Sequence, residues 1–436
     1  MSLTQSLISL IRSKPIETAD FESAALFTLD AVATAYAGSA TPVGKVLQDW
    51  AAGSDLDLKR QVLLMGALTH ITETDDLHRA SVTHPGCVVV AAALALGEKQ
   101  GSSPKQILTA ILHGFEAMCR IGAAVGPTHY KVWHNTATCG PFGSAMAAAT
   151  LLGLDDEQTM HALGNAGTQS SGFWQFMETG AMSKHLHAGR ASESGLLAAE
   201  LAAHGFTGSP EILEGAKGMF AGMCIDPIPE NILKASDEWQ LPLTSIKPWP
   251  SCRHTHPLID CALELHGQLN DEEITSIEIE TYQAAVDVCD RPEPDSEYQA
   301  KFSLYHCAAI ALLDGVVTLD SFNADARNKT RDLRQRTQVN VIDPYASSYP
   351  KSWGSAVKIK TTNGNTLEVS RKDCKGDPEL PLSNREMLTK AKGLMAYAGL
   401  TESKAEEVCE SILSLPDRSE PITLFTDYIN SLNSCR

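Results

Sequence analysis

The chain has 436 residues, of which 43% are hydrophobic and 20% charged, enough to bury a sizeable core in two or three domains. Its formal net charge of −18 argues against a general nucleic-acid binder and against a protein that binds anionic membrane surfaces. The eleven cysteines are scattered and include no C-x-x-C pair, which favours a reducing compartment over a disulfide framework.

No segment predicts a signal or membrane-spanning helix. The apolar patch before Arg12 and Pro15 is too short for a signal core. The longest apolar run, Cys87–Leu96, is about half as long as a spanning helix requires. We therefore expect a soluble, cytoplasmic protein.

The sequence up to about residue 240 predicts helices almost throughout. Apolar residues recur at a spacing near 3.6, and the abundant alanines are typical of helices that pack closely in a buried bundle. Ser103 before Pro104 predicts a capped helix start, whereas Gly38 and Gly205 predict helix ends. The expected helices are Phe21–Ala37, Cys87–Gly97, Ser103–Ala124, Gly140–Leu152, Asp155–Ala166 and Ala191–His204.

The pattern changes after Lys247. Isoleucines alternate with polar residues in Glu273–Tyr282, as in a strand, and Asn363-Gly364 predicts a hairpin turn. The other elements expected here are strands at Gln338–Ile342, Ala356–Lys360 and Thr366–Ser370 and a helix at Ser303–Leu313. Helices are expected again at Arg385–Ala398, Glu402–Leu413 and Ile422–Leu432.

These patterns predict a mainly α fold, in which a large all-helical domain carries an inserted, smaller α+β domain. We expect the helical domain to comprise residues 1–244 and 383–436, and the inserted domain to comprise residues 245–382.

Histidine or lysine precedes an alanine-rich predicted helix at four places, which are His84, His134, residues 184–187 and residues 247–256. The start of a helix attracts anions, because its N–H groups are unpaired and the helix dipole is positive there. The pattern therefore predicts a pocket for a small polycarboxylate and acid–base chemistry on it.

Around the first place, the carboxylates Glu73, Asp75 and Asp76 lie between His70 and His84. Carboxylates this close repel one another unless a cation neutralises them, so the segment is either a solvated acidic turn or part of a site. The spacing matches neither H-E-x-x-H nor an EF-hand loop, and no metal is expected.

The next two places each allow two interpretations. His134, beside Trp133, is either a core histidine or an acid–base catalyst that faces a cavity. Lys184, His185 and His187 form either a solvated basic turn or, because their flanks are apolar, a partly buried group that requires an anion.

The fourth place, KPWPSCRHTHP, is stiffened by three prolines and lies where the helical pattern ends. Cys252 is either a packed thiol or a nucleophile in a cationic setting. In an extended segment His254 and His256 would point to the same side, but no third metal ligand is evident nearby.

Taken together, six segments in this order resemble the MmgE/PrpD family, whose members include 2-methylcitrate dehydratases, cis-aconitate decarboxylases and iminodisuccinate epimerases. The segments are Ala25–Gly38, HITETDDLH…THPG, HNTATCGPFGSAMAAATLLGL, SKHLHAGRASESGLLAAELAAHGFTGSPEILEG, KPWPSCRHTHPLID and FSLYHCAAIALLDG. The resemblance implies a helical domain with an α+β lid and a pocket between them. It also implies catalysis without metal or organic cofactor, and a homodimer.

The resemblance also implies site residues. The pocket residues of the decarboxylases fall on Glu73, His84, His134, Lys184 and Lys247. Glu73 replaces an Asp of the family, and the stretch between Asp76 and His84 is one residue longer. Two further positions differ: a pocket histidine falls on Cys252, and a tyrosine falls on His306, which follows Tyr305. These departures leave open which of the family's activities this protein has.

The resulting hypothesis is a cofactor-independent lyase that removes a proton next to a carboxylate of a di- or tricarboxylate. A dehydration like that of 2-methylcitrate is preferred, with epimerisation or decarboxylation as alternatives. The expected catalytic residues are His84, His134, Lys184 and Lys247. The expected substrate-binding residues are Glu73, Asp75, His187, Cys252, Arg253, His254, His256, Tyr305 and His306. Two rival classes are a metal-dependent hydrolase using Asp75, Asp76, His78 and His84 and a catalytically silent carboxylate-binding protein.

Overall fold

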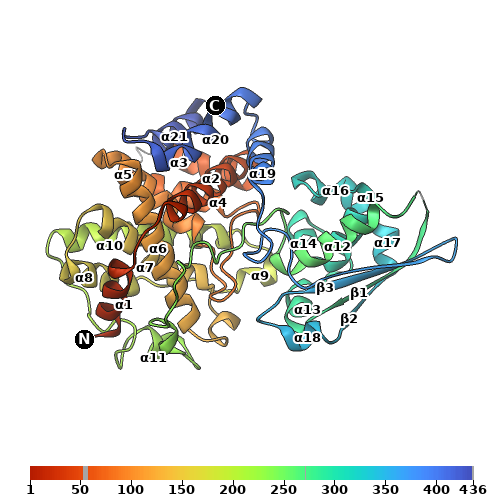
Figure 1. Ribbon diagram of the computed structural model, residues 1–436, viewed down its shortest axis with the longest axis horizontal. Coiled ribbons are helices and arrows are strands. Elements are labelled where there is room, and N and C mark those ends of the chain that lie inside the picture. Colours follow the sequence, from red (N-terminus) through yellow and green to blue (C-terminus); the bar gives the residue numbers. More distant parts are fainter. Residues whose placement is uncertain (53–56, 271, 435–436) are drawn as a thin grey trace. The chain divides into compact units, whose positions relative to one another are not determined.

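The long apolar, alanine-rich segments form a helical unit, and the alternating segments form a second unit around a small sheet (Figure 1). The computed structural model describes residues 1–52, 57–270 and 272–434. Unit 1 consists of Met1–Ile71, Asp75–Ile246 and Ser383–Arg436, and unit 2 consists of Thr72–Thr74 and Lys247–Leu382. The predicted mainly α fold is confirmed.

Unit 1 is a bundle around α5, in which every residue from Gly86 to Gly97 is buried. The C-terminal helices return to the N-terminal ones: α19 and α20 pack on α2, and α21 packs on α5 (Figure 1). The helices of unit 1 are α1 (Leu3–Ser13), α2 (Thr18–Ala40), α3 (Pro42–Ala52), α4 (Leu58–Thr69), α5 (Gly86–Gln100), α6 (Pro104–Ala124), α7 (Asn135–Leu151), α8 (Asp156–Gly167), α9 (Phe176–Thr179), α10 (Ser183–Ala203), α11 (Met219–Met223), α19 (Asn384–Tyr397), α20 (Glu402–Leu413) and α21 (Leu424–Ser434).

Local capping explains where several of these helices begin. The Ser103 hydroxyl accepts a hydrogen bond from the Gln106 N–H, and the Gln106 side chain in turn accepts one from the Ser103 N–H. This capping box and Pro104 in the first turn confirm the predicted start of α6. Asp155 caps α8 in the same way.

Several predicted helix boundaries were wrong; α2 begins three residues before the predicted Phe21, and α7 begins at Asn135, five residues before the predicted Gly140. Gly38 does not end α2, which continues to Ala40; a Cβ at Gly38 would lie 1.9 Å from the Leu68 carbonyl oxygen, so this glycine permits close packing against α4. Helix α10 begins at Ser183, eight residues before the predicted start at Ala191. Lys184, His185 and His187 therefore lie within the first turns of α10 instead of preceding it.

Unit 2 is built on a four-stranded sheet with the order β2-β1-β3-β4. Strand β1 (Ile274–Thr281) pairs in parallel with β2 (Thr337–Val341) and antiparallel with β3 (Ser355–Thr361), which continues through the predicted hairpin into β4 (Thr366–Arg371). Ile277 and Ile279 of β1 belong to the core that also includes residues of α12 and α15. The helices of unit 2 are α12 (His256–His266), α13 (Gln283–Cys289), α14 (Glu297–Lys301), α15 (Leu304–Asp314), α16 (Ala324–Lys329), α17 (Arg331–Gln335) and α18 (Tyr345–Ser348).

One helix, α6, is long and apolar enough to cross a membrane, but 89% of its apolar window is buried inside the protein. Its apolar character is therefore that of a core helix.

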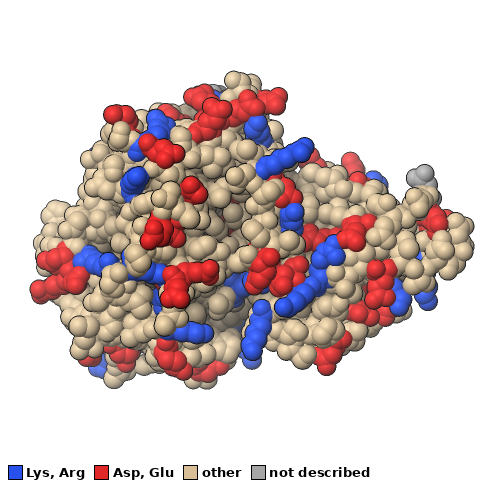
Figure 2. All heavy atoms as spheres, in the orientation of Figure 1, with Lys and Arg blue, Asp and Glu red and all other residues tan. Residues whose placement is uncertain are grey.

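The ten cysteines in the described part of the chain are all free. On the face shown in Figure 2, lysines and arginines are dispersed among aspartates and glutamates, so an anionic ligand would need a local group of cations.

Candidate active site

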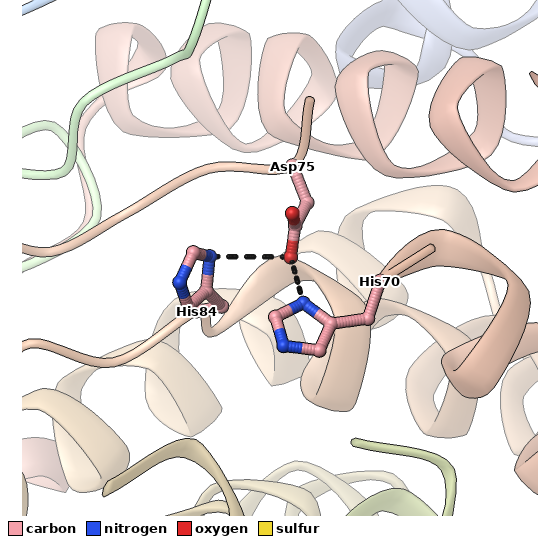
Figure 3. A group of neighbouring side chains, drawn as sticks. All are labelled: His70, Asp75 and His84. Carbon is pink, nitrogen blue, oxygen red and sulfur yellow. Dashed lines mark hydrogen bonds and ion pairs between the residues drawn. The ribbon is translucent and has the colours of Figure 1, made fainter. Parts of the chain in front are cut away.

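The centre of the candidate site in unit 1 is Asp75, which holds two imidazoles (Figure 3). Its Oδ2 lies 2.5 Å from Nδ1 of His70 and 3.2 Å from Nδ1 of His84. Asp75 and His70 are fully buried, whereas His84 is 9% exposed. His84 is therefore the imidazole of this cluster that is nearest to solvent.

The sequence positions these three residues through the ends of three helices. His70 is the C-cap residue of α4. The carboxylate of Asp76 accepts the Gly86 N–H through both oxygens, at 3.0 and 3.1 Å, and so fixes the segment to the start of α5. The backbone N–H of His84 donates to the Thr136 hydroxyl in the first turn of α7.

The electrostatics of the cluster favour a charged Asp75 and a neutral His70. Burial lowers the pKa of His70 to about 3, and the positive charge of Lys184 acts in the same direction. Although burial opposes it, the two imidazoles hold the pKa of Asp75 well below its usual range. Since the ionised Asp75 must accept a proton from Nδ1 of His70, the Nε2 atom of His70 carries the free lone pair.

A second group of basic residues packs against this centre. The His134 ring stacks on the His70 ring at 5.5 Å, and His134 Nδ1 lies 3.3 Å from His187 Nδ1. Burial lowers the pKa of His134 well below its ordinary value, and the charges of His70 and Lys184 lower it further. Lys184 is itself buried at 4% exposure, so several imidazoles are kept neutral around one buried amine.

A cavity of about 500 Å³ in unit 1 reaches this group through His187, which forms part of its wall. Arg190, Ser183 and Gln175 supply polar groups to the wall, and Phe173 and Phe176 are among its apolar residues. The cavity is large enough for a small polycarboxylate and brings it beside an imidazole of the cluster.

The residue types His70, Asp75 and His84 are also metal ligands, and their donor atoms lie within 4.8 Å of one another. However, ligands on a tetrahedral zinc are separated by about 3.3 Å, given bonds of about 2.0 Å. The 2.5 Å between His70 and Asp75 is instead the separation of a strong hydrogen bond. In this structure Asp75 therefore hydrogen-bonds His70 and lies within ion-pair distance of His84.

Unit 2 contains a separate polar cluster around Lys247, which is only 1% exposed. Its ammonium group donates to the backbone oxygen of Glu73 at 3.2 Å and lies 3.4 Å from the Glu73 carboxylate. Glu73 has a φ of +62°, a left-handed conformation that is rare for a non-glycine residue and often marks a functional position.

Two side chains with polar tips border this second cluster. The Cys289 thiol donates a hydrogen bond to Cys252, which lowers the pKa of the Cys252 thiol. The Tyr298 hydroxyl is buried without a hydrogen-bond partner among the described residues. Burial raises the pKa of Tyr298, and the nearby charge of Glu73 raises it further, so the phenol stays protonated and can donate.

Comparison with known proteins agrees with the sequence resemblance. Residues 6–231 match the MmgE/PrpD N-terminal domain, and residues 249–415 match the MmgE/PrpD C-terminal domain. The chain belongs to the MmgE/PrpD family.

The curated relatives of this chain include proteins named cis-aconitate decarboxylase from three species. The Mus musculus protein is 25% identical over 380 residues, which cover 82% of this chain and 75% of the relative. The Aspergillus terreus protein is 26% identical over 393 residues, with coverage of 84% and 79%. The Homo sapiens protein is 29% identical over 380 residues, with coverage of 83% and 77%.

In this MmgE/PrpD protein, three of the expected substrate-binding residues have buried partners within unit 2. Arg253 forms a buried ion pair with Asp377. The His254 ring stacks on Trp353 at 4.5 Å, and its Nδ1 hydrogen-bonds the Tyr282 hydroxyl at 2.7 Å. His256 Nε2 lies 3.2 Å from the Ser251 carbonyl oxygen. The segment is not extended, because Arg253–Thr255 is a 3-10 turn and His256 begins α12.

Tyr305 and His306, at the start of α15, are also engaged elsewhere in unit 2. The Tyr305 hydroxyl donates to Asp290 at 2.8 Å. Both ring nitrogens of His306 have partners, the Thr330 hydroxyl and the Ser321 carbonyl oxygen.

Three residues of these clusters, His70, His185 and Tyr298, were not among the site residues predicted from the sequence. His70 was noted beside the carboxylates, but no local pattern distinguishes it from His78, whose Nδ1 instead hydrogen-bonds the Ser81 hydroxyl. His185 Nδ1 lies 3.2 Å from the His70 carbonyl oxygen, a contact between α10 and the end of α4 that spans 115 residues of sequence. Such contacts become visible only once the helices are packed.

Proposed function

We propose that this protein is a cofactor-independent lyase that acts on a small di- or tricarboxylate by proton transfer next to a carboxylate. The observation that carries the proposal is the buried Asp75–His84 pair, in which an ionised carboxylate orients an imidazole beside neutral histidines and a buried lysine. A neutral imidazole held this way is suited to act as a general base.

In the proposed reaction, Nε2 of His84 takes a proton from the carbon next to a substrate carboxylate. Lys184 stabilises the negative charge that develops on that carboxylate. In a dehydration the hydroxyl on the adjacent carbon leaves, and the imidazolium of His84 returns its proton to form water. Because the pKa values of His70, His134 and His187 are lowered, these imidazoles stay neutral around the proposed base. Among the family's activities we propose this 2-methylcitrate-like dehydration.

Decarboxylation of cis-aconitate is the second candidate, and it is favoured by the names of the relatives. Here loss of carbon dioxide leaves a carbanion, which Lys184 protonates. The departures from the decarboxylase pattern at Glu73, Cys252 and His306 weigh against it.

A substrate panel followed by NMR in D₂O separates these reactions. We expect 2-methylcitrate or a close hydroxy acid to lose water, whereas a decarboxylase would release carbon dioxide from cis-aconitate. An epimerase would exchange solvent deuterium into iminodisuccinate. If no member of the panel reacts or exchanges, the carbon-acid proposal fails and a silent binding protein is favoured.

The rival metal-dependent hydrolase is tested on the same preparation. We expect turnover to survive dialysis against EDTA, and elemental analysis to find less than one metal ion per chain. We also propose a homodimer, from the family resemblance alone, and a cytoplasmic location, from the sequence pattern; sedimentation equilibrium measures the mass, and a monomer would contradict the homodimer.

A further inference from the structure

An arginine that the proposed reaction does not use lies buried in unit 2. Arg334, on the short helix α17, is 7% exposed. Its Nη1 donates to the Arg327 carbonyl oxygen at 2.7 Å and to the Thr330 hydroxyl at 2.8 Å. Thr330 also contacts His306, so the guanidinium is held in place by a buried network.

The other side of this guanidinium has no partner. Among the described residues, Arg334 forms no ion pair, its Nε is buried without a hydrogen bond and its Nη2 makes none. Nε–H and Nη2–H point in parallel from one side of a guanidinium and are a donor pair that binds two oxygens of a carboxylate or phosphate. A buried cation with this pair unused lacks the compensation that such burial normally requires.

The same arginine lines a cavity of about 250 Å³. The wall also contains Arg331, which likewise has no ion pair among the described residues, together with Gln335, Pro292 and Pro294. Glu293 is the one acidic residue in this wall. Burial and the charges of Arg331 and Arg327 lower the pKa of Arg334, and the charge of Glu293 offsets only part of this effect.

We propose that this cavity is an oxyanion-binding site, in which Arg334 and Arg331 bind a phosphate or carboxylate group of a small metabolite. The site is separate from the histidine cluster of unit 1, and it does not depend on which reaction that cluster performs. The negative charge of Glu293 repels a bound anion and therefore limits the site to a moderate affinity. Alternatively, the Glu293 carboxylate accepts a hydrogen bond from a hydroxyl group of the same ligand.

Isothermal titration calorimetry with inorganic phosphate, and in a second arm with acetate, tests the site on the full chain and separates phosphate from carboxylate recognition. We expect saturable binding of at least one probe. Arg331→Gln should weaken that binding about tenfold or more, since one charged hydrogen-bonding partner is lost. Glu293→Gln should instead tighten it, because a repelling charge is removed.

Two controls make the result specific. Arg336→Gln removes a nearby exposed arginine that does not line the cavity and should leave binding unchanged. Lys184→Gln, in the histidine cluster, should also leave it unchanged; a loss there would place the anion at that cluster and overturn the proposal. The proposal would also be overturned if neither probe bound, or if Arg331→Gln and Glu293→Gln bound the probe equally well. Arg334 would then serve only as a hydrogen-bond donor within the fold.

Discussion

The residue on which the histidine cluster depends most is Asp75, because its carboxylate hydrogen-bonds one imidazole and lies 3.2 Å from a second. Replacement by asparagine keeps the size of the side chain but removes the charge that His70 and His84 face. We expect Asp75→Asn to lower kcat by about 10²–10⁴-fold, as when a general base loses its orientation. Steady-state kinetics on whichever substrate the panel identifies measures this loss.

His78 provides the matched control for this variant. It lies three residues from Asp75 and is equally buried, but its Nδ1 bonds the Ser81 hydroxyl at 2.8 Å. His78→Gln should retain turnover within a few-fold per folded molecule. If it lost as much activity as Asp75→Asn, the effect would be one of local folding and not of the histidine cluster.

The ion pair between Lys247 and Glu73 makes a second prediction at this scale. Lys247→Met removes the ammonium partner of a carboxylate that is 2% exposed, and we expect the free energy of unfolding to fall by about 3–5 kcal/mol. When Glu73 is already replaced by glutamine, Lys247→Met should lower the free energy of unfolding by less, because no buried carboxylate then loses its partner. Urea unfolding of the four proteins measures the coupling, and equal costs in both backgrounds would contradict it.

At the scale of elements, the packing of α10 on α4 brings the basic residues of α10 to His70. Gly189 makes this approach possible, since a Cβ there would lie 2.3 Å from the Leu63 carbonyl oxygen. Gly189→Ala must push the helices apart, and we expect a loss of about 1–3 kcal/mol in unfolding free energy together with a loss of activity.

An exposed helical glycine with open space provides the comparison. A Cβ at Gly393 of α19 would meet nothing within 4 Å, so Gly393→Ala should stabilise the protein by about 0.5–1 kcal/mol without changing turnover. Thermal unfolding and kinetics of both variants test the contrast. A Gly189→Ala protein as stable and active as the parent would show that α10 and α4 are not held by close contact.

The elements also show what could be predicted from sequence. Alternating isoleucines and the Asn-Gly turn placed the strands within a residue or two, because these signals are local. The start of α10 was missed because Ser-Lys-His-Leu-His resembles a polar turn, whereas its burial against α4 and α7 makes it helical. The meeting of His70, Asp75 and His84 depends on the relative placement of α4, α5 and α7, which no spacing in the sequence encodes.

For the whole molecule, the number of buried neutral histidines determines how stability responds to acid. Seven buried histidines have lowered pKa values: near 3 for His70 and His254, near 4 for His78, His113 and His306, and below the ordinary value for His129 and His134. Burial is the largest cause for each. Four carboxyl groups act in the opposite sense, because burial raises the pKa values of Asp76, Glu98, Asp260 and Glu280.

The sign follows from proton binding. Between about pH 6.5 and pH 4 the unfolded chain protonates these histidines and the folded protein does not, so stability falls as the pH falls. The carboxyl groups hold protons only in the folded state over part of this range and offset some of the loss. Since the histidines outnumber them, we expect the free energy of unfolding to drop by about 3–5 kcal/mol from pH 6.5 to pH 4.5.

One substitution tests how much a single buried histidine contributes to this pH dependence of stability. His113 bonds the Thr150 hydroxyl and stacks on Trp239, outside the histidine cluster of the proposed site. His113→Asn should flatten the pH dependence by up to about 1.4 kcal/mol per pH unit, the contribution of one proton, whereas the same change at exposed His204 should not. Urea unfolding of both variants at several pH values measures the slopes. If both slopes matched that of the parent, buried histidines would not be the source of the acid sensitivity.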